Sequence, residues 1–386
     1  MHIFLGIAGL FLVLVILWDV FETIILPRRI TRKFRLARTF YRSTWRPWSR
    51  IAKWMRPSNR RETYLSFYGP LSLLFLFAVW AVGLIFAFAV LHKAAGSAIN
   101  VSGMPDASQV QAGFWTDLYM SGTTFFTLGL GDVIPRTTIA RVIMVFEAGL
   151  GFGFLGLAIS YLPVLYGAFS RREVNISLLD ARAGSPPTAS ELFKRHTQPK
   201  SVEALEEYLK DWERWSAELM ESHLSYPVLC YFRSQHNNES WLAALTTILD
   251  VSALLLAYGT GALRWQAKMT FAISRHAIVD LSQVLNCPPL QNIKERLPDG
   301  GCEKMIALME AAAIPHSMEG CSQMLTELRQ MYEPYIAALS ARLLMPVAPW
   351  ISEKAQKDNW KTTAWARISA DVERVPHSER DEREHF

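Results

Sequence analysis

The sequence predicts an all-α membrane protein, with three transmembrane helices, a re-entrant helix before the third, and an α-helical cytoplasmic domain. Of its 386 residues, 51% are hydrophobic and 19% are charged, and the mean hydropathy is positive. This composition excludes a disordered polymer and disfavours an ordinary soluble domain. Long apolar runs fill the first half of the chain, and helical periodicity without alternating strands fills the second half.

Residues 1–27 are predicted to form the first transmembrane helix. The apolar run from Ile3 to Leu26 is long enough to cross a hydrocarbon core of about 30 Å. A signal peptide is the alternative interpretation, but no Lys or Arg precedes the run and no small-residue cleavage site follows it. We therefore expect a helix that stays in the membrane.

Two acidic residues lie inside this first helix. Asp19 and Glu22 are three positions apart, so they share one helical face. Arg28 and Arg29 follow the helix directly, and their long side chains can reach back to pair with the two carboxylates. A proton- or ion-linked role is the alternative, because ionisable groups inside a membrane often mark functional sites.

Residues 28–62 form a basic segment that we expect at the cytoplasmic membrane surface. Basic residues recur through residue 61 with no Asp or Glu among them. Five arginines recur every third or fourth residue and so share one helical face, namely Arg35, Arg38, Arg42, Arg46 and Arg50. We interpret this face as a binding site for anionic lipid headgroups. Nucleic acid needs the same charges, but flanking apolar runs tether the segment to a membrane, so no nucleic-acid partner is expected.

Residues 63–169 contain two further predicted spans. The outer helix, 64–91, carries no Asp, Glu, Lys or Arg, and the inner helix, 137–169, ends just before another pair of arginines. Because basic residues concentrate on the cytoplasmic side of membrane proteins, the three spans agree on one topology. The N-terminus lies outside, and the long C-terminal part lies in the cytoplasm beneath the cell membrane.

A short apolar stretch and a glycine-rich loop separate these two spans. Residues 114–126 are too few to cross a bilayer but suit a re-entrant half-helix, and residues 127–132 read Thr-Leu-Gly-Leu-Gly-Asp. Irregular backbone at membrane depth is tolerated where it lines a water-filled path. A ladder of carbonyl oxygens can replace the water shell of K⁺ when the backbone alternates in handedness, and Gly129 and Gly131 occupy alternate positions.

This stretch resembles the pore loop of tetrameric potassium channels, in particular the bacterial two-span type, whose filter reads T-V-G-Y-G-D. The five residues 117–121 also fall where that family often has D-A-L-Y-F-S. The resemblance covers Tyr64 to about Phe169 and implies a homotetramer with one pore loop per chain. It implies K⁺ as the permeant ion, no resident metal beyond K⁺ and no organic cofactor. The implied selectivity filter consists of Thr127, Leu128, Gly129, Leu130, Gly131 and Asp132.

Three positions depart from the family pattern. Leu130 replaces the usual Tyr, and Phe126 replaces the Thr that usually precedes the filter. Thr123 stands where some relatives carry a carboxylate, so we expect Asp132 to lack that partner. Two alternatives to a K⁺-selective channel therefore stay open, a non-selective cation channel and a membrane-anchored sensor on a non-conducting scaffold.

The inner helix carries the predicted gating elements. Gly151 stands where the family commonly has a hinge glycine, although small residues also serve close helix packing. Pro163 is expected to kink the inner end. Glu147 is an intramembrane acid, for which we favour a structural hydrogen bond over ion sensing. Three residues near the inner end are gate candidates, namely Leu162, Leu165 and Tyr166.

The remaining chain is predicted to be a linker at 170–200, an α-helical cytoplasmic domain at 201–370 and a charged tail at 371–386. This domain is expected to regulate or assemble the channel. Residues 241–257 are apolar enough to suggest a fourth span, but Asp250 at their centre favours a buried helix of a soluble bundle.

No feature of the sequence indicates an enzyme. The small cluster at 259–261 lacks the strand-and-helix frame of a dinucleotide site, so a nucleotide-binding regulatory domain is not expected. Histidines and acids of the C-terminal part have spacings that match no known metal site, namely Glu221, His223, His236, His276 and Asp280. The four cysteines form no C-x-x-C pair, and we interpret them as reduced thiols.

Overall fold

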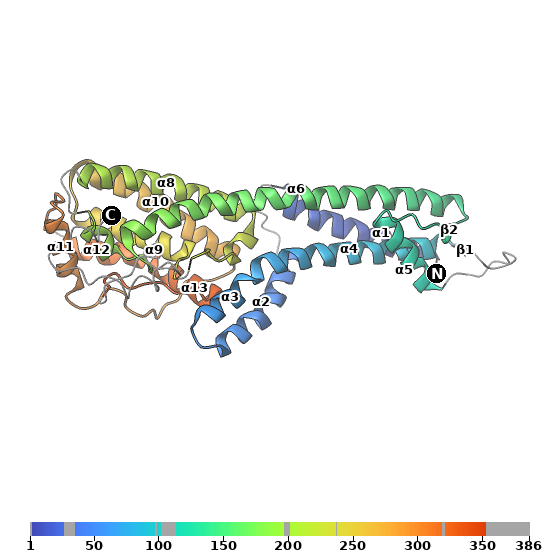
Figure 1. Ribbon diagram of the computed structural model, residues 1–386, viewed down its shortest axis with the longest axis horizontal. Helices are drawn as coiled ribbons and strands as arrows, with labels where there is room; N and C mark the ends of the chain where they lie inside the picture. Colours follow the sequence, from blue (N-terminus) through green and yellow to red (C-terminus); the bar gives the residue numbers. More distant parts are fainter. Residues whose placement is uncertain are drawn as a thin grey trace, which may run out of the picture. The chain divides into compact units, whose positions relative to one another are not determined.

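The computed structural model describes residues 2–26, 35–96, 99–101, 113–196, 201–236, 238–318 and 321–352. The described chain is helical apart from one pair of three-residue strands and a single isolated bridge, which confirms the predicted all-α class (Figure 1). It divides into two compact units. Unit 1 comprises Met1–Ser170 and Glu221–Arg233, and unit 2 comprises Arg171–Met220 and Ser234–Phe386. The predicted tail at 371–386, the expected end of the helical domain near 370, and Arg28 and Arg29 lie outside the described residues.

Four described helical segments are long and apolar enough to span a membrane. The fourth, Trp241–Tyr258, lies in unit 2, whereas unit 1 contains α1 with the turn after it, α3 with α4, and most of the apolar part of α6. In chain order its elements are α1 (His2–Val20), the π-helical turn η1 (Phe21–Ile25), α2 (Leu36–Trp54), α3 (Asn59–Ser66), α4 (Tyr68–Ala94), β1 (Ile99–Val101), α5 (Phe114–Phe125), β2 (Val133–Pro135), the first part of α6 (Thr138–Ala183), the end of α8 (Ser201–Ser225) and the 3₁₀ turn η2 (Pro227–Tyr231).

The first helix packs along α4 over much of its length (Figure 1). A Cβ atom at Gly9 would lie 3.1 Å from the carbonyl oxygen of Ala87 and 2.9 Å from Leu91 Cγ, so the absence of a side chain allows the two helices to approach closely. Ile16 and Trp80 are buried in the apolar cluster of unit 1. The extra N-terminal helix is therefore an integral part of this unit.

A segment from far along the chain completes unit 1. Residues 221–233 leave unit 2 and pack against the start of α4. The ring of Tyr231 lies 5.0 Å from that of Trp45 and 5.2 Å from that of Tyr68, centroid to centroid. Phe232 packs so closely on Gly69 that a Cβ there would lie 2.6 Å from its ring. No pattern in the sequence predicts this contact between segments so far apart in the chain.

Unit 2 is a bundle of helices. Its elements are the end of α6, α7 (Ala189–Lys194), most of α8, α9 (Trp241–Tyr258), α10 (Gly261–Val284), α11 (Gly301–Ala311), α12 (Cys321–Gln330) and α13 (Glu333–Leu343). Among the described residues, no group of three or more His, Cys, Asp or Glu side chains comes close enough to hold a metal ion. His276 instead lies 3.1 Å from Asp280 on the same helix.

The predicted linker at 170–200 is wrong over much of its length. Helix α6 continues to Ala183, and α7 follows at Ala189–Lys194. The cause is an amphipathic pattern past residue 170, with Ile176, Leu179 and Ala183 buried on one face. The helix ends where Gly184 adopts a left-handed φ of 73°, the usual conformation of a helix-terminating glycine.

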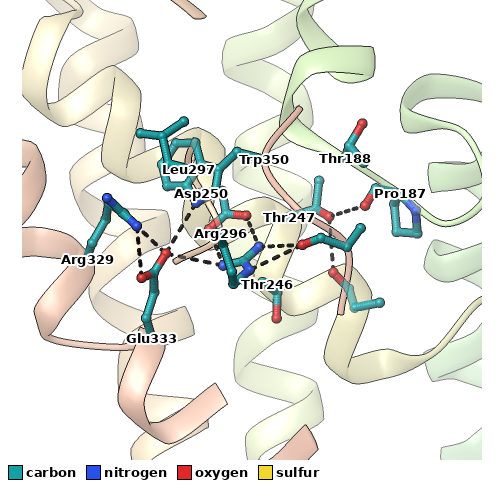
Figure 2. Close-up of polar contacts among 12 residues, drawn as sticks. Pro187, Thr188, Thr246, Thr247, Asp250, Arg296, Leu297, Arg329, Glu333 and Trp350 are labelled. Atoms are coloured by element: carbon teal, nitrogen blue, oxygen red, sulfur yellow. Dashed lines mark hydrogen bonds and ion pairs between the residues drawn. The ribbon is translucent and has the colours of Figure 1, made fainter. Parts of the chain in front are cut away.

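Helix α9 is enclosed by unit 2, as the buried-helix interpretation expects. Every residue of α9 is buried, and α7, α10, α12 and α13 all contact it. Arg296 Nη1 and Nη2 donate to the two carboxylate oxygens of Asp250 at 3.0 and 2.5 Å, and Tyr332 donates to the same carboxylate at 2.7 Å. Figure 2 shows Arg296 between Asp250 and Glu333. A charge in an apolar helix is thus neutralised by a partner from another segment.

Candidate functional site

The candidate site begins with α5, whose 12 residues are too few to cross a bilayer. One face of α5 is buried and contacts α4, and its buried residues are Asp117, Met120, Ser121, Thr124 and Phe125. At its end, the amides of Thr127 and Leu128 donate to the carbonyls of Thr124 and Thr123 at 2.9 and 2.8 Å. The negative end of the helix dipole therefore lies where the glycine-rich loop starts.

The loop after α5 alternates in backbone handedness. The φ angle is +55° at Thr127, +58° at Gly129 and +74° at Gly131, whereas Leu128 and Leu130 keep negative φ. A Cβ at either glycine would meet nothing within 4 Å in the single chain, so conformation rather than space calls for glycine. Thr127 is β-branched, and positive φ is rare for such a residue. Strained backbone positions of this kind cluster at functional sites.

Both carboxylate oxygens of Asp132, the last residue of this loop, accept hydrogen bonds. The hydroxyl of Tyr119 donates to Asp132 Oδ2 at 2.7 Å, and the amide of Val133 donates to Oδ1 at 3.1 Å. Val133 then enters β2, which pairs with β1. Thr123 does not replace the carboxylate that some relatives carry, because its hydroxyl donates to the carbonyl oxygen of Met120 at 2.9 Å. Tyr119, one turn earlier on α5, provides a different partner for Asp132. The sequence signal for this partner was a tyrosine four residues before Thr123, on the same face of the helix.

Glu147 lies behind α5 and has partners from two other helices. His92 Nε2 lies 3.0 Å from Glu147 Oε2, and the Ser121 hydroxyl contacts Glu147 Oε1. All three side chains are fully buried. The hydrogen-bonding role expected for Glu147 is present in the structure. His92, at the end of α4, was missed because nothing in a linear sequence links positions 92 and 147.

Gly151 lies where α6 crosses the end of α5. A Cβ atom at this position would lie 1.9 Å from the carbonyl oxygen of Phe125, closer than any real contact, whereas a Cβ at Gly153 would meet nothing within 4 Å. Close packing therefore requires Gly151, and its use as a hinge stays a prediction. Pro163 lies within α6 and is exposed. Of the gate candidates, Leu165 is fully buried in the apolar cluster, whereas Tyr166 is exposed.

Asp19 caps the N-terminus of α2, the next helix along the chain. Its carboxylate accepts hydrogen bonds from the amides of Leu36 and Ala37, at 3.0 and 3.1 Å, and from the Trp80 indole at 3.0 Å. Backbone amides at a helix start otherwise lack partners, and a carboxylate there also favours the helix dipole. Asp19 thus fixes α2 to α1 and α4.

The basic face of α2 is real but shorter than predicted. Arg35 precedes the helix and turns toward Glu22, with Nε 3.7 Å from the carboxylate and Nη2 donating to Thr23 Oγ1 at 3.2 Å. Glu22 also accepts a hydrogen bond from the Trp18 indole at 2.7 Å. Arg35 is therefore removed from the predicted lipid-binding set. The four exposed members that remain on one side of α2 are Arg38, Arg42, Arg46 and Arg50.

Comparison with known proteins agrees with this geometry. Residues 73–165 match a family model described as "Ion channel". An uncharacterized membrane protein of Bacillus subtilis (strain 168), YdjJ, is 22% identical over 203 residues, which cover 52% of this chain and 57% of that protein. The chain thus spans just over half the length of the curated relative it matches. No solved structure matches the chain.

The matched region contains α5, the glycine-rich loop and most of the apolar part of α6. Unit 1 is therefore an ion-channel-like membrane unit, and its similarity points to a channel rather than an enzyme. The apolar helices and the membrane-protein relative agree with a location in a membrane.

Proposed function

We propose that the chain forms a K⁺-selective channel that conducts passively across the cell membrane. The alternating handedness at Thr127, Gly129 and Gly131 carries this proposal. Alternation of this kind turns successive carbonyl oxygens to one side, where they can replace the water shell of K⁺. The filter is formed by the backbone oxygens of residues 127–131, and Asp132 closes its outer end.

The pore is a homotetramer. Phe126 directly precedes the loop, and Leu128 and Leu130 lie within it; they are 58%, 60% and 61% exposed in the single chain. Exposed apolar side chains of this size mark contact surfaces. Four copies around one axis would cover these side chains and bring four filter strands together.

The N-terminus lies outside, and unit 2 lies in the cytoplasm, where it regulates the pore. The concentration of positive charge between α1 and α4 supports this orientation. The four exposed arginines of α2 bind anionic lipid headgroups of the inner leaflet. Helices α6 and α8 each belong to both units, so a change within unit 2 is transmitted along continuous helix to unit 1.

Ion flux tests the function. Purified protein in liposomes is given K⁺ and Na⁺ gradients in separate experiments. We expect K⁺ flux without Na⁺ flux, and loss of flux in Gly129→Ala because Ala disfavours the required φ. Gly153→Ala is the matched control and should conduct, because its Cβ meets nothing within 4 Å.

Each other outcome favours a different function. Equal flux of both ions favours a non-selective cation channel. Persistent silence of the full-length protein in both gradients favours a sensor on a non-conducting scaffold. Conduction that Gly129→Ala leaves intact would contradict a filter at this loop.

A further inference from the structure

Three polar side chains meet where α5 packs against α4 and α6. Ser121 comes from α5, His92 from the last turn of α4 and Glu147 from α6. The Ser121 hydroxyl contacts Glu147 Oε1 and lies 2.8 Å from the carbonyl oxygen of Ile85, while His92 Nε2 lies 3.0 Å from Glu147 Oε2. This Ser121–Glu147–His92 network joins the helix before the filter to the helices on either side of it.

The three contacts of the network require three protons. Each contact pairs two electronegative atoms, which attract one another only when a proton lies between them. The Ser121 hydroxyl has one proton, and His92 Nε2 provides a second. The carbonyl oxygen of Ile85 can only accept. The third proton must therefore belong to Glu147, which donates to Ser121, and Ser121 donates to Ile85.

The surroundings of His92 Nδ1 support the same number of protons in the network. His92 Nδ1 is buried and has no hydrogen-bond partner among the residues that the structure describes. In a neutral ring this atom is a bare acceptor, whereas a cationic ring would place an unsatisfied N–H there at considerable cost. An ionised Glu147–His92 pair would thus leave one buried donor unpaired and one contact without a proton. The neutral arrangement satisfies all three contacts.

Among the described residues, no permanently charged side chain is paired with Glu147. Among the described titratable groups, His92 is the one that acts on Glu147. Lys93 adjoins His92 on α4, and Asp117 lies one turn before Ser121 on α5. Arg141, on α6, donates instead to the carbonyl oxygen of Pro135 at 3.1 Å. A buried carboxyl group with a histidine and a hydroxyl as neighbours favours its neutral form.

We propose that Glu147 is a positioning residue that holds α5 as a neutral carboxylic acid, and that loss of its proton reduces conduction. This proposal rests on the proposed channel function. When hydroxide removes the proton as water, two protons remain for three contacts. Ser121 must then release either Ile85 or Glu147. One hydrogen bond between α5 and its neighbouring helices is then lost, six residues before the filter begins.

The flux experiment compares wild type with Glu147→Gln between about pH 6 and about pH 9. The Gln amide nitrogen can donate to Ser121 and its oxygen can accept from His92, so this variant keeps all three contacts without a titrating proton. We expect wild-type K⁺ flux to fall about tenfold over this range, corresponding to about 1.4 kcal/mol, and Glu147→Gln flux to stay constant. Glu62→Gln, on α3, should keep the wild-type profile.

A wild-type flux that does not change with pH would overturn the proposal. A Glu147→Gln profile that matches that of wild type would overturn it as well, because the pH response would then originate elsewhere.

Infrared spectroscopy tests the proton on Glu147 without requiring ion flux. Wild type in liposomes should show the carbonyl band of a buried protonated carboxyl group at neutral pH, and this band should vanish as the pH is raised. Glu147→Gln should lack the band from the start. A silent protein that shows the band contradicts the channel function but keeps the protonation of Glu147. A conducting protein without the band overturns the present inference alone.

Discussion

Asp250 in unit 2 and Glu147 in unit 1 are both buried acids within a helix, but their partners differ in kind. Asp250 faces the guanidinium of Arg296, which keeps its charge at every physiological pH. Glu147 faces a histidine and a hydroxyl group, neither of which carries a fixed charge. The first network is therefore set by permanent charge, and the second by the number of protons it holds.

The two networks also differ in redundancy. Arg296 donates to the carbonyl oxygen of Ala348 at 3.0 Å as well as to Asp250, and Glu333 accepts from the Trp350 indole at 3.2 Å (Figure 2). Although burial alone lowers the pKa of Arg296, the neighbouring charge and hydrogen bonds of Asp250 raise it above its ordinary value. Redundant fixed charges suit a structural core. A minimal network without fixed charge suits a place that responds to its surroundings.

Removing the fixed charge should have the largest effect. Asp250→Ala leaves Arg296 buried without its main partner, and we expect a loss of about 3–5 kcal/mol in unfolding free energy. The measurement is thermal unfolding of the detergent-solubilised full-length protein. Asp211→Ala is the control, because Asp211 lies exposed on α8. If both variants unfold like wild type, the Asp250–Arg296 pair does not stabilise unit 2.

A steric change beside Glu147 should have the next largest effect. Gly151→Ala places a Cβ against the carbonyl oxygen of Phe125, so α5 and α6 must separate. Overpacking of this kind costs about 1–3 kcal/mol. We expect lower thermal stability and lower K⁺ flux in Gly151→Ala than in Gly153→Ala. Equal behaviour of the two variants would show that the contact between Gly151 and Phe125 does not position α5.

The parts of this comparison were not equally predictable from the sequence. The spans, α5 and the glycine-rich loop depend on local length and pattern, so they could be predicted. The partners of Glu147 could not, because they depend on how three helices pack. The linker prediction failed because the run at 184–187 marks the end of α6, whereas the amphipathic pattern continues up to it. The docking of residues 221–233 rests on aromatic contacts that no periodicity reveals.

Asp19 offers a third kind of buried acid, whose described partners include three N–H donors. Asp19→Asn replaces one accepting oxygen with an NH₂ group and sets a donor against a donor at Trp80 or at the start of α2. We expect a loss of about 1–3 kcal/mol, again from thermal unfolding. Glu22→Gln should cost less, because its contact with Arg35 is long at 3.7 Å. The reverse order would contradict the capping role of Asp19.

The smallest expected effect concerns acid and unit 2. Burial lowers the pKa of His196, whose Nδ1 contacts the carbonyl oxygen of Leu192. The unfolded chain therefore binds a proton more readily than the folded chain as the pH falls below the ordinary value of about 6.5. Stability from this group is fully present above that pH and is lost as the pH falls toward the lowered pKa. We expect a difference of about 1 kcal/mol or less between pH 8 and pH 5.5.

His196→Gln should remove this part of the acid sensitivity, whereas His276→Gln, at an exposed position on α10, should not. The sign separates the two regions of the molecule. Acid weakens unit 2 through a histidine that is buried neutral, whereas alkali weakens the contacts of α5 through an acid that is buried neutral. If wild type and His196→Gln are equally acid-sensitive in unfolding, the acid response of unit 2 comes from other groups. The expected alkaline response of Glu147 would be unaffected by that result.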